Sequence, residues 1–371
     1  MFSHLFTPIT VGGITLKNRI TMAPLYLGYA GPGGAVSPLL LYHYRLMAQS
    51  GAAMIVVEGS TVDHTLGSGS DRTIRADTDD NLEGLGRLAR TIQKEGALAC
   101  LQINHAGRFA GVAEPVAPFG VETFGKLPRA LTSQEIDRIA DRFAQAASRA
   151  KKAGFDMVEL HGGTGYLLSQ FVSPHTNKRD DDYGGSLENR IKFPLMVLSR
   201  VKSAVGDFPV GYRFLADEWL PDGLTLQESV PFAEALEKAG IAYISVMGGT
   251  YESFFIPEMV EKCKAVAYMA DLAAAVKNKV QVPVITAGRI KNGTVAEQVI
   301  ADGKADLVGL ARVLMCDPEW PKKVGEGREQ EITHCDETCP DACTQLVMKG
   351  KPAYCSRWSP KKVRQYKALF Q

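Results

Sequence analysis

The chain has 371 residues, of which 45% are hydrophobic and 22% charged, and its 42 basic and 41 acidic residues leave a net charge of +1. These values exclude a disordered chain and a collagen-like repeat, and they disfavour a general binder of nucleic acid. The chain carries no run near the roughly 20 apolar residues of a membrane span and no leader pattern after Met1. We therefore expect an unprocessed cytoplasmic protein with neither a membrane nor a nucleic-acid partner.

Short apolar runs rich in β-branched residues alternate with longer amphipathic stretches along most of the chain. Before them, Phe6–Leu16 holds two apolar runs around Gly12 and Gly13, which predicts a hairpin that closes the floor of the fold. The predicted buried strands are Arg19–Pro24, Ala53–Gly59, Ala99–His105, Met157–Gly162, Pro209–Leu215, Tyr243–Gly248, Pro283–Gly288 and Leu307–Arg312.

Helical segments separate these strands, as in Ser133–Gly154, where Thr132 and Glu135 form a capping-box pattern. Strict alternation of eight strands and helices predicts an α/β fold, a closed (β/α)8 TIM barrel, rather than an open doubly wound sheet. We assign 1–330 to the barrel and 331–371 to a cysteine-rich extension. Because Thr344–Gln371 holds basic residues and no acid, we interpret it as a solvated tail, with a docking face for an acidic partner as the alternative.

The reactive groups of such a barrel lie at the C-terminal ends of its strands. The loops after the seventh and eighth strands commonly bind phosphate through backbone N–H groups. Here those loops carry Gly288 with Arg289 and Ala311 with Arg312, so the sequence predicts a phosphorylated ligand.

Two motifs identify a family resemblance. Gly165–Phe171 reads GYLLSQF and Asp182–Arg190 reads DYGGSLENR; Met22-Ala23-Pro24 and Asp306–Pro318 agree with them. Together they resemble the signature of the old yellow enzyme family over essentially the whole chain. The resemblance implies a flavin oxidoreductase with FMN across the top of the barrel.

Carried over by position, the resemblance assigns contacts to the FMN. Pro24, Leu25 and Gly59 would offer backbone contacts to the isoalloxazine, and Gln102 would hydrogen-bond its pyrimidine edge. Arg213 would lie near flavin N1, where positive charge favours the reduced form. Gly288, Arg289, Ala311 and Arg312 would hold the phosphate, in agreement with the argument from the strand ends.

The loop after the fourth strand would carry the catalytic residues. Tyr166 matches the family's proton donor to an activated alkene, and His161 matches a donor to the substrate carbonyl. The second carbonyl donor is usually His or Asn but is Thr164 here, which weakens the two-donor clamp. The alternative for Tyr166 and His161 is a structural role. Glu252, where some relatives carry a catalytic histidine, is interpreted as a solvated loop acid.

Four cysteines, Cys335, Cys339, Cys343 and Cys355, cluster in the extension, while Cys100, Cys263 and Cys316 are scattered. Their spacing resembles the [4Fe–4S] loop of the branch that includes 2,4-dienoyl-CoA reductase, 2-enoate reductase and trimethylamine dehydrogenase, although the first gap is one residue longer. This resemblance implies a cluster held by these four thiolates. A zinc site is the alternative, because zinc accepts the same ligands.

We therefore expect an FMN and [4Fe–4S] oxidoreductase that reduces an activated C=C bond, in an enoyl-CoA or an enone. Because no Rossmann fingerprint follows the barrel, a separate electron-transfer flavoprotein or NAD(P)H would exchange the electrons. Three alternatives remain: an amine dehydrogenase or demethylase, a non-catalytic electron-transfer subunit, and a flavin-free aldolase-type barrel with zinc. A homo-oligomer is the default expectation.

Overall fold

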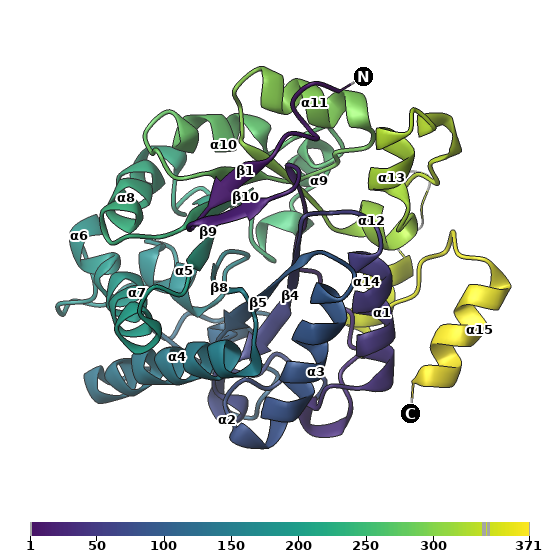
Figure 1. The fold of residues 1–371 in the computed structure, drawn as a ribbon. Helices are drawn as coiled ribbons and strands as arrows, with labels where there is room; N and C mark the ends of the chain where they lie inside the picture. Colours follow the sequence, from purple (N-terminus) through teal and green to yellow (C-terminus); the bar gives the residue numbers. More distant parts are fainter. Residues whose placement is uncertain (1, 336–338, 340–341, 371) are drawn as a thin grey trace.

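The computed structural model describes residues 2–335, 339 and 342–370. Within them, eight parallel strands close into a barrel in the order β10-β11-β12-β3-β4-β5-β8-β9, and β9 pairs with β10 (Figure 1). The strands are β3 (Ile20–Met22), β4 (Met54–Thr61), β5 (Leu98–Asn104), β8 (Met157–Gly162), β9 (Val210–Asp217), β10 (Tyr243–Gly248), β11 (Val284–Thr286) and β12 (Leu307–Leu310). The predicted (β/α)8 TIM barrel is confirmed.

Helices cover the outside of the barrel. The main ones are α1 (Pro38–Ala48), α3 (Leu82–Gln93), α4 (Ser133–Ala153), α7 (Lys192–Val205), α8 (Leu226–Lys238), α10 (Ala270–Lys277), α11 (Gly293–Ala301), α12 (Arg312–Cys316) and α13 (Trp320–Gly325). Helix α4 begins at the predicted capping box of Thr132 and Glu135 and ends at Gly154, whose φ of +87° is left-handed. No described helix is long and apolar enough to cross a membrane.

Shorter elements lie in the loops. They are α2 (His64–Gly67), α5 (Leu167–Val172), α6 (Leu187–Arg190), α9 (Pro257–Lys262), β6 (Val116–Ala117) and β7 (Arg129–Ala130). Helix α5 follows β8, and α9 lies in the long loop between β10 and α10. The loops after β5, β8 and β10 therefore all leave the C-terminal end of the barrel, where their side chains can meet.

The predicted hairpin is present as β1 (Ile9–Val11) and β2 (Ile14–Leu16), which pair antiparallel. Gly12 and Gly13 form its turn with φ values of +56° and +82°, a conformation that favours glycine. Val11 and Leu16 pack against residues near the starts of the barrel strands: Met54, Cys100, Met157, Tyr243 and Leu307. The hairpin thus closes the N-terminal end of the barrel, as expected.

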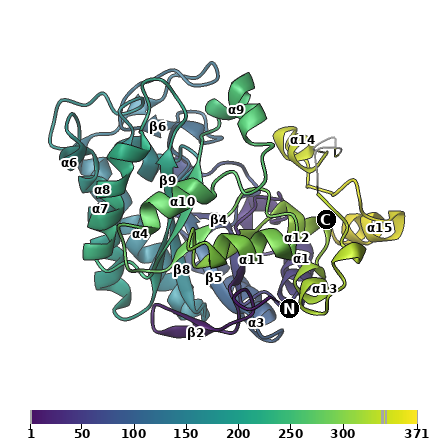
Figure 2. The ribbon, with the colours of Figure 1, turned by 90° about the horizontal axis from the view of Figure 1, so that it is seen from above.

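The extension contains α14 (Ala342–Met348) and α15 (Pro360–Leu369), which lie beside α1, α12 and α13 (Figure 2). Tyr366 of α15 is 0% exposed, and its hydroxyl lies 3.1 Å from Nδ1 of His43. Its ring stacks at 4.4 Å on Trp358, whose indole N–H donates to the Met315 carbonyl at 2.9 Å. The interpretation of this segment as a solvated tail is wrong: an aromatic face docks the helix, while Lys361, Arg364 and Lys367 on its outer side are exposed.

Candidate active site

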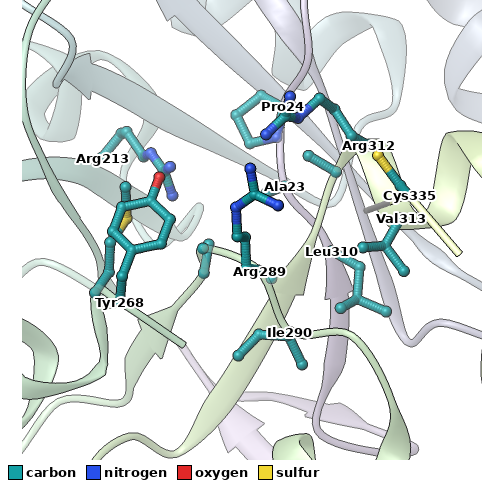
Figure 3. A pocket seen from close by; sticks show the side chains of 15 residues that line it. Ala23, Pro24, Arg213, Tyr268, Arg289, Ile290, Leu310, Arg312, Val313 and Cys335 are labelled. Atoms are coloured by element: carbon teal, nitrogen blue, oxygen red, sulfur yellow. The ribbon is translucent and has the colours of Figure 1, made fainter. Parts of the chain in front are cut away.

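A cavity of about 160 Å³ opens at the C-terminal ends of β3, β9, β11 and β12. Three arginines, Arg213, Arg289 and Arg312, line it together with Ala23 and Pro24. In Figure 3 the Arg289 guanidinium lies between those of Arg213 and Arg312. The structure therefore gathers side chains from strand β9, the loop after β11 and the start of helix α12 into one cationic cavity.

The residues after β11 form one wall of the cavity, and two of them have left-handed backbone conformations. Gly288 has a φ of +93°, and a Cβ there would lie 2.8 Å from the Tyr268 ring. Arg289 is also left-handed, with a φ of +52°, and its Nε donates to the Cys263 carbonyl at 2.6 Å. A side chain at residue 288 would enter the cavity wall, so this turn requires glycine.

A buried hydrogen-bond network joins strands β5, β8 and β10 inside the barrel. Gln102 Nε2 donates to Glu159 Oε1 at 2.8 Å, and the Tyr243 hydroxyl donates to Glu159 Oε2 at 2.9 Å. Burial raises the pKa of the Glu159 carboxyl, and the nearby Arg213 guanidinium opposes that rise. Because Glu159 holds the amide nitrogen, the Gln102 oxygen is directed elsewhere, 3.3 Å from the position of a Cβ on Gly59.

Sequence reasoning missed Glu159 and Tyr243. The available signal was the acid itself, which interrupts an apolar strand in the middle of the barrel. A fully buried acid needs partners, so such a residue marks a polar network before its members are known.

The loop after β8 brings His161 and Tyr166 together, with ring centroids 4.8 Å apart. The Gly163 N–H donates to His161 Nδ1 at 3.3 Å, which leaves the proton of a neutral ring on Nε2. Burial, assisted by the Arg213 charge, lowers the pKa of His161 to about 3. His161 is therefore a neutral donor at physiological pH.

Tyr166 has a second aromatic neighbour, Tyr251, in the loop after β10. Its hydroxyl lies 2.8 Å from the hydroxyl of Tyr251, and the Phe109 ring packs edge-on to both. Burial raises the pKa of Tyr166 well above its usual range, with Tyr251 adding to the effect. Tyr166 thus keeps its proton at neutral pH.

Thr164 adopts a left-handed φ of +59°, a conformation that strains a β-branched residue. Its hydroxyl donates to the Met247 sulfur at 3.3 Å. Thr164, the predicted second donor to the substrate carbonyl, therefore already donates its hydroxyl proton to Met247 within the protein.

Glu252 is not the solvated acid that the sequence suggested. Arg108, whose side chain is 1% exposed, pairs with the carboxylate through Nη2, and its Nη1 lies 3.3 Å from Oε1. His175 Nε2 lies 3.5 Å from Oε2 of the same carboxylate. Together the Arg108 guanidinium and the His175 hydrogen bond lower the pKa of Glu252 although burial opposes them. Glu252 therefore connects the loops that follow β5, β8 and β10 at the C-terminal end of the barrel.

The predicted metal ligands Cys335, Cys339, Cys343 and Cys355 are all described, and all are free thiols. Cys335 lines the cavity beside Arg312 (Figure 3). Among the described residues, no three His, Cys, Asp or Glu side chains are grouped closely enough to hold a metal ion. Residues 336–338 and 340–341 of the same loop lie outside the described residues.

Cys316 also differs from its interpretation in the sequence. The sequence placed it apart from the other thiols, but its side chain hydrogen-bonds with Cys355, and both are buried. The reason is the docked extension, which brings Cys355 against the end of α12. No local sequence signal connects residues so distant in the chain.

Comparisons with known proteins add the family. Residues 4–331 match the NADH:flavin oxidoreductase / NADH oxidase family. An NADH oxidase of Thermoanaerobacter brockii is 42% identical over 343 residues, which cover 90% of this chain and 52% of the relative. An NADPH dehydrogenase of a Geobacillus species is 34% identical over 327 residues, which cover 86% of this chain and 93% of the relative.

Solved structures agree in fold. A 2-naphthoyl-CoA reductase complex has a TM-score of 0.92 and 29% identity, covering 99% of this chain and 58% of that one. A morphinone reductase has a TM-score of 0.75 and 27% identity, covering 90% and 93%. The chain spans about half the length of the T. brockii relative. It belongs to the NADH:flavin oxidoreductase / NADH oxidase family.

Proposed function

We propose that this protein reduces an activated C=C bond conjugated to a carbonyl group. The observation that carries the proposal is the neutral His161 beside the protonated Tyr166, with ring centroids 4.8 Å apart. One group donates a hydrogen bond to a carbonyl oxygen and the other holds a proton for carbon. Bound FMN supplies the hydride that this chemistry requires.

The residues of the cavity fit FMN. Three guanidinium groups line the cavity, and Gly288 leaves part of its wall without a side chain. Positive charge next to an open backbone is the environment that a phosphate group needs. Gln102, oriented by Glu159, presents an acceptor near Gly59, which suits the N–H of a pyrimidine edge. We assign cofactor contacts to Pro24, Leu25, Gly59, Gln102, Arg213, Gly288, Arg289, Ala311 and Arg312.

In this mechanism each side chain has one task. His161 Nε2–H binds the carbonyl oxygen and withdraws electron density from the alkene. Tyr166 gives its hydroxyl proton to the α-carbon. Because the Thr164 hydroxyl already donates to Met247, carbonyl activation rests mainly on His161.

The substrate class is an enone or an enoyl thioester. The names of two structural neighbours, a 2-naphthoyl-CoA reductase and a morphinone reductase, support this class. The rings of Phe109, Phe124 and Phe255 form a chain of aromatic contacts beside Tyr166, which suits an apolar substrate.

We further propose a [4Fe–4S] cluster on Cys335, Cys339, Cys343 and Cys355 within 331–371. Burial raises the pKa of Cys335, the charges of Cys339, Cys343 and Cys355 add to the rise, and Arg312 opposes it. Four thiolates supplied by one segment are the donor set that a cluster needs. Zinc remains the competing occupant.

For the electron source we propose NAD(P)H, in line with the names of the NADH oxidase and NADPH dehydrogenase relatives. A separate flavoprotein is the second candidate, because α15 presents the exposed cations Lys361, Arg364 and Lys367. An acidic partner would bind such a surface.

Anaerobic purification followed by flavin, iron, sulfide and zinc analysis tests the cofactors. FMN with about four irons per chain supports the proposal, and FMN with zinc removes the cluster alone. Stopped-flow mixing of the reduced enzyme with 2-cyclohexenone or crotonyl-CoA then tests the substrate class. Reoxidation by neither, together with flavin reduction by a methylated amine, would replace the proposal with an amine dehydrogenase.

A further inference from the structure

The hydroxyl of Tyr251 completes a path for protons that the proposed mechanism leaves open. Tyr166 loses its proton at each turnover and must regain one before the next. We propose that Tyr251 is a proton relay, passing a proton from solvent to the Tyr166 hydroxyl. This inference rests on the proposed function, since it concerns the proton that Tyr166 delivers.

The distance between the two hydroxyl oxygens, 2.8 Å, is that of a direct hydrogen bond. Tyr251 is 38% exposed, whereas Tyr166 lies deeper, with its ring against His161. The pair therefore connects water to the proton donor through one intermediate hydroxyl.

Tyr251 is held in this position by its surroundings. Its ring meets Phe109 at 5.1 Å and Tyr166 at 5.7 Å, both edge-on. On one side of it the Thr250 N–H donates to Ser253 Oγ at 2.8 Å, and on the other Glu252 pairs with buried Arg108. The loop thus fixes the hydroxyl where a relay needs it.

The other polar side chains near Tyr166 have hydrogen-bond or ion-pair partners of their own. The Tyr26 hydroxyl hydrogen-bonds with Ser70, and Glu252 is held by Arg108 and His175. His161 accepts from Gly163 at Nδ1 and so offers its single proton at Nε2. Of these groups, Tyr251 is the one that hydrogen-bonds with the Tyr166 hydroxyl.

Every proton is accounted for over one turnover. The O–H bond of Tyr166 breaks as a C–H bond forms at the α-carbon. The resulting phenolate takes the proton of Tyr251, and Tyr251 takes one from water. Burial raises the pKa values of both phenols, so each group holds a proton that it can pass on.

The test is Tyr251→Phe, which keeps the ring and removes the hydroxyl. Enzyme is mixed with excess NADPH and 2-cyclohexenone, and turnover is followed beyond the first cycle in H₂O and D₂O, because the first cycle uses the proton already on Tyr166. We expect turnover after the first cycle to be about tenfold slower, with a larger solvent isotope effect. Imidazole buffer should restore part of the rate, because a small acid can enter the vacated space. Flavin reduction by NADPH should not change.

Two further variants separate the possible failures. Tyr166→Phe should slow reoxidation by about 100-fold or more, and Tyr183→Phe, a phenol on a different loop, should have no effect. If Tyr166→Phe has no effect, the proposed function itself fails. If Tyr166→Phe is slow but Tyr251→Phe matches the native enzyme in rate and isotope effect, only the relay is wrong. A slow Tyr251→Phe without buffer rescue assigns Tyr251 a packing role and also overturns the relay.

Discussion

Arg108 and Glu252 form an ion pair in which a nearly inaccessible guanidinium meets a carboxylate that is only 22% exposed. The pair joins the loop after β5 to the loop after β10, and His175 adds the loop after β8. Three segments distant in the sequence are therefore fixed to one another above the cavity.

Replacing Glu252 by Gln should loosen this junction. The variant leaves the Arg108 charge buried without its counterion, which should lower the free energy of unfolding by about 2 kcal/mol. Chemical denaturation measures that change. Glu258→Gln, an exposed acid in the same segment, is the matched control and should be neutral. Equal stability of the two variants would contradict a structural role for the pair.

Stability should fall as the pH falls below neutrality. Burial lowers the pKa of His43 and of His161 to about 3, far below their usual value. Between roughly pH 6.5 and 3 the unfolded chain binds protons that the native protein does not, so each histidine removes up to about 1.4 kcal/mol per pH unit. His43→Asn should reduce this slope in denaturation curves between about pH 6.5 and 4.5. An unchanged slope would mean that the native site accepts the proton.

Gly288 should be essential for the cofactor. Alanine there brings a Cβ to 2.8 Å from the Tyr268 ring at a φ of +93°. We expect Gly288→Ala to weaken FMN binding by about tenfold or more, measured by quenching of FMN fluorescence. Gly303→Ala is the control for backbone strain, because Gly303 also has a positive φ but no neighbour within 4 Å of its Cβ position. Comparable FMN affinity in both variants would remove the steric argument.

The ligand set of the extension can be tested by cysteine replacement. Cys343→Ala should lose bound iron, because three thiolates hold a four-iron cluster poorly. Cys316→Ala should retain iron, since Cys316 lies on α12 and serves only as a hydrogen-bond neighbour of Cys355. Iron and sulfide analysis reports both results. If Cys316→Ala lost iron while Cys335→Ala retained it, Cys316 would replace Cys335 as a proposed ligand.

Removing the outer charges of α15 should slow exchange with an acidic electron carrier. The triple variant of Lys361, Arg364 and Lys367 to Gln changes exposed groups only. We expect electron transfer with flavodoxin to fall by about tenfold at low salt, while reduction by dithionite is unchanged. The same change at Lys94, Lys152 and Lys238, exposed cations elsewhere, is the control. Equal rates for both triple variants would exclude this surface.

The local part of the fold was predictable from the sequence. Strands such as Met157–Gly162 and Tyr243–Gly248 match their predicted bounds, because apolar β-branched runs between turn residues leave few other structures. The hairpin was predictable from its two glycines. The helix at Ser133–Ala153 was predictable because its capping box is local.

Contacts across the fold were not predictable in the same way. The hydrogen bond from Tyr251 to Tyr166 depends on how two loops pack, and neither loop encodes the other. The docking of Tyr366 on Trp358 and His43 depends likewise on tertiary packing, since the basic composition of that segment is typical of a solvated tail. The cavity arginines were predictable because barrel topology fixes which strand ends are neighbours.

The hairpin that closes the N-terminal end of the barrel has a kinetic consequence. Val11 and Leu16 pack into that end, and the cavity opens at the opposite, C-terminal end of the barrel. An electron donor and an electron acceptor that both need this face must occupy it in turn. Steady-state rates measured against both substrates should therefore give parallel double-reciprocal lines, and excess donor should inhibit by holding the entrance.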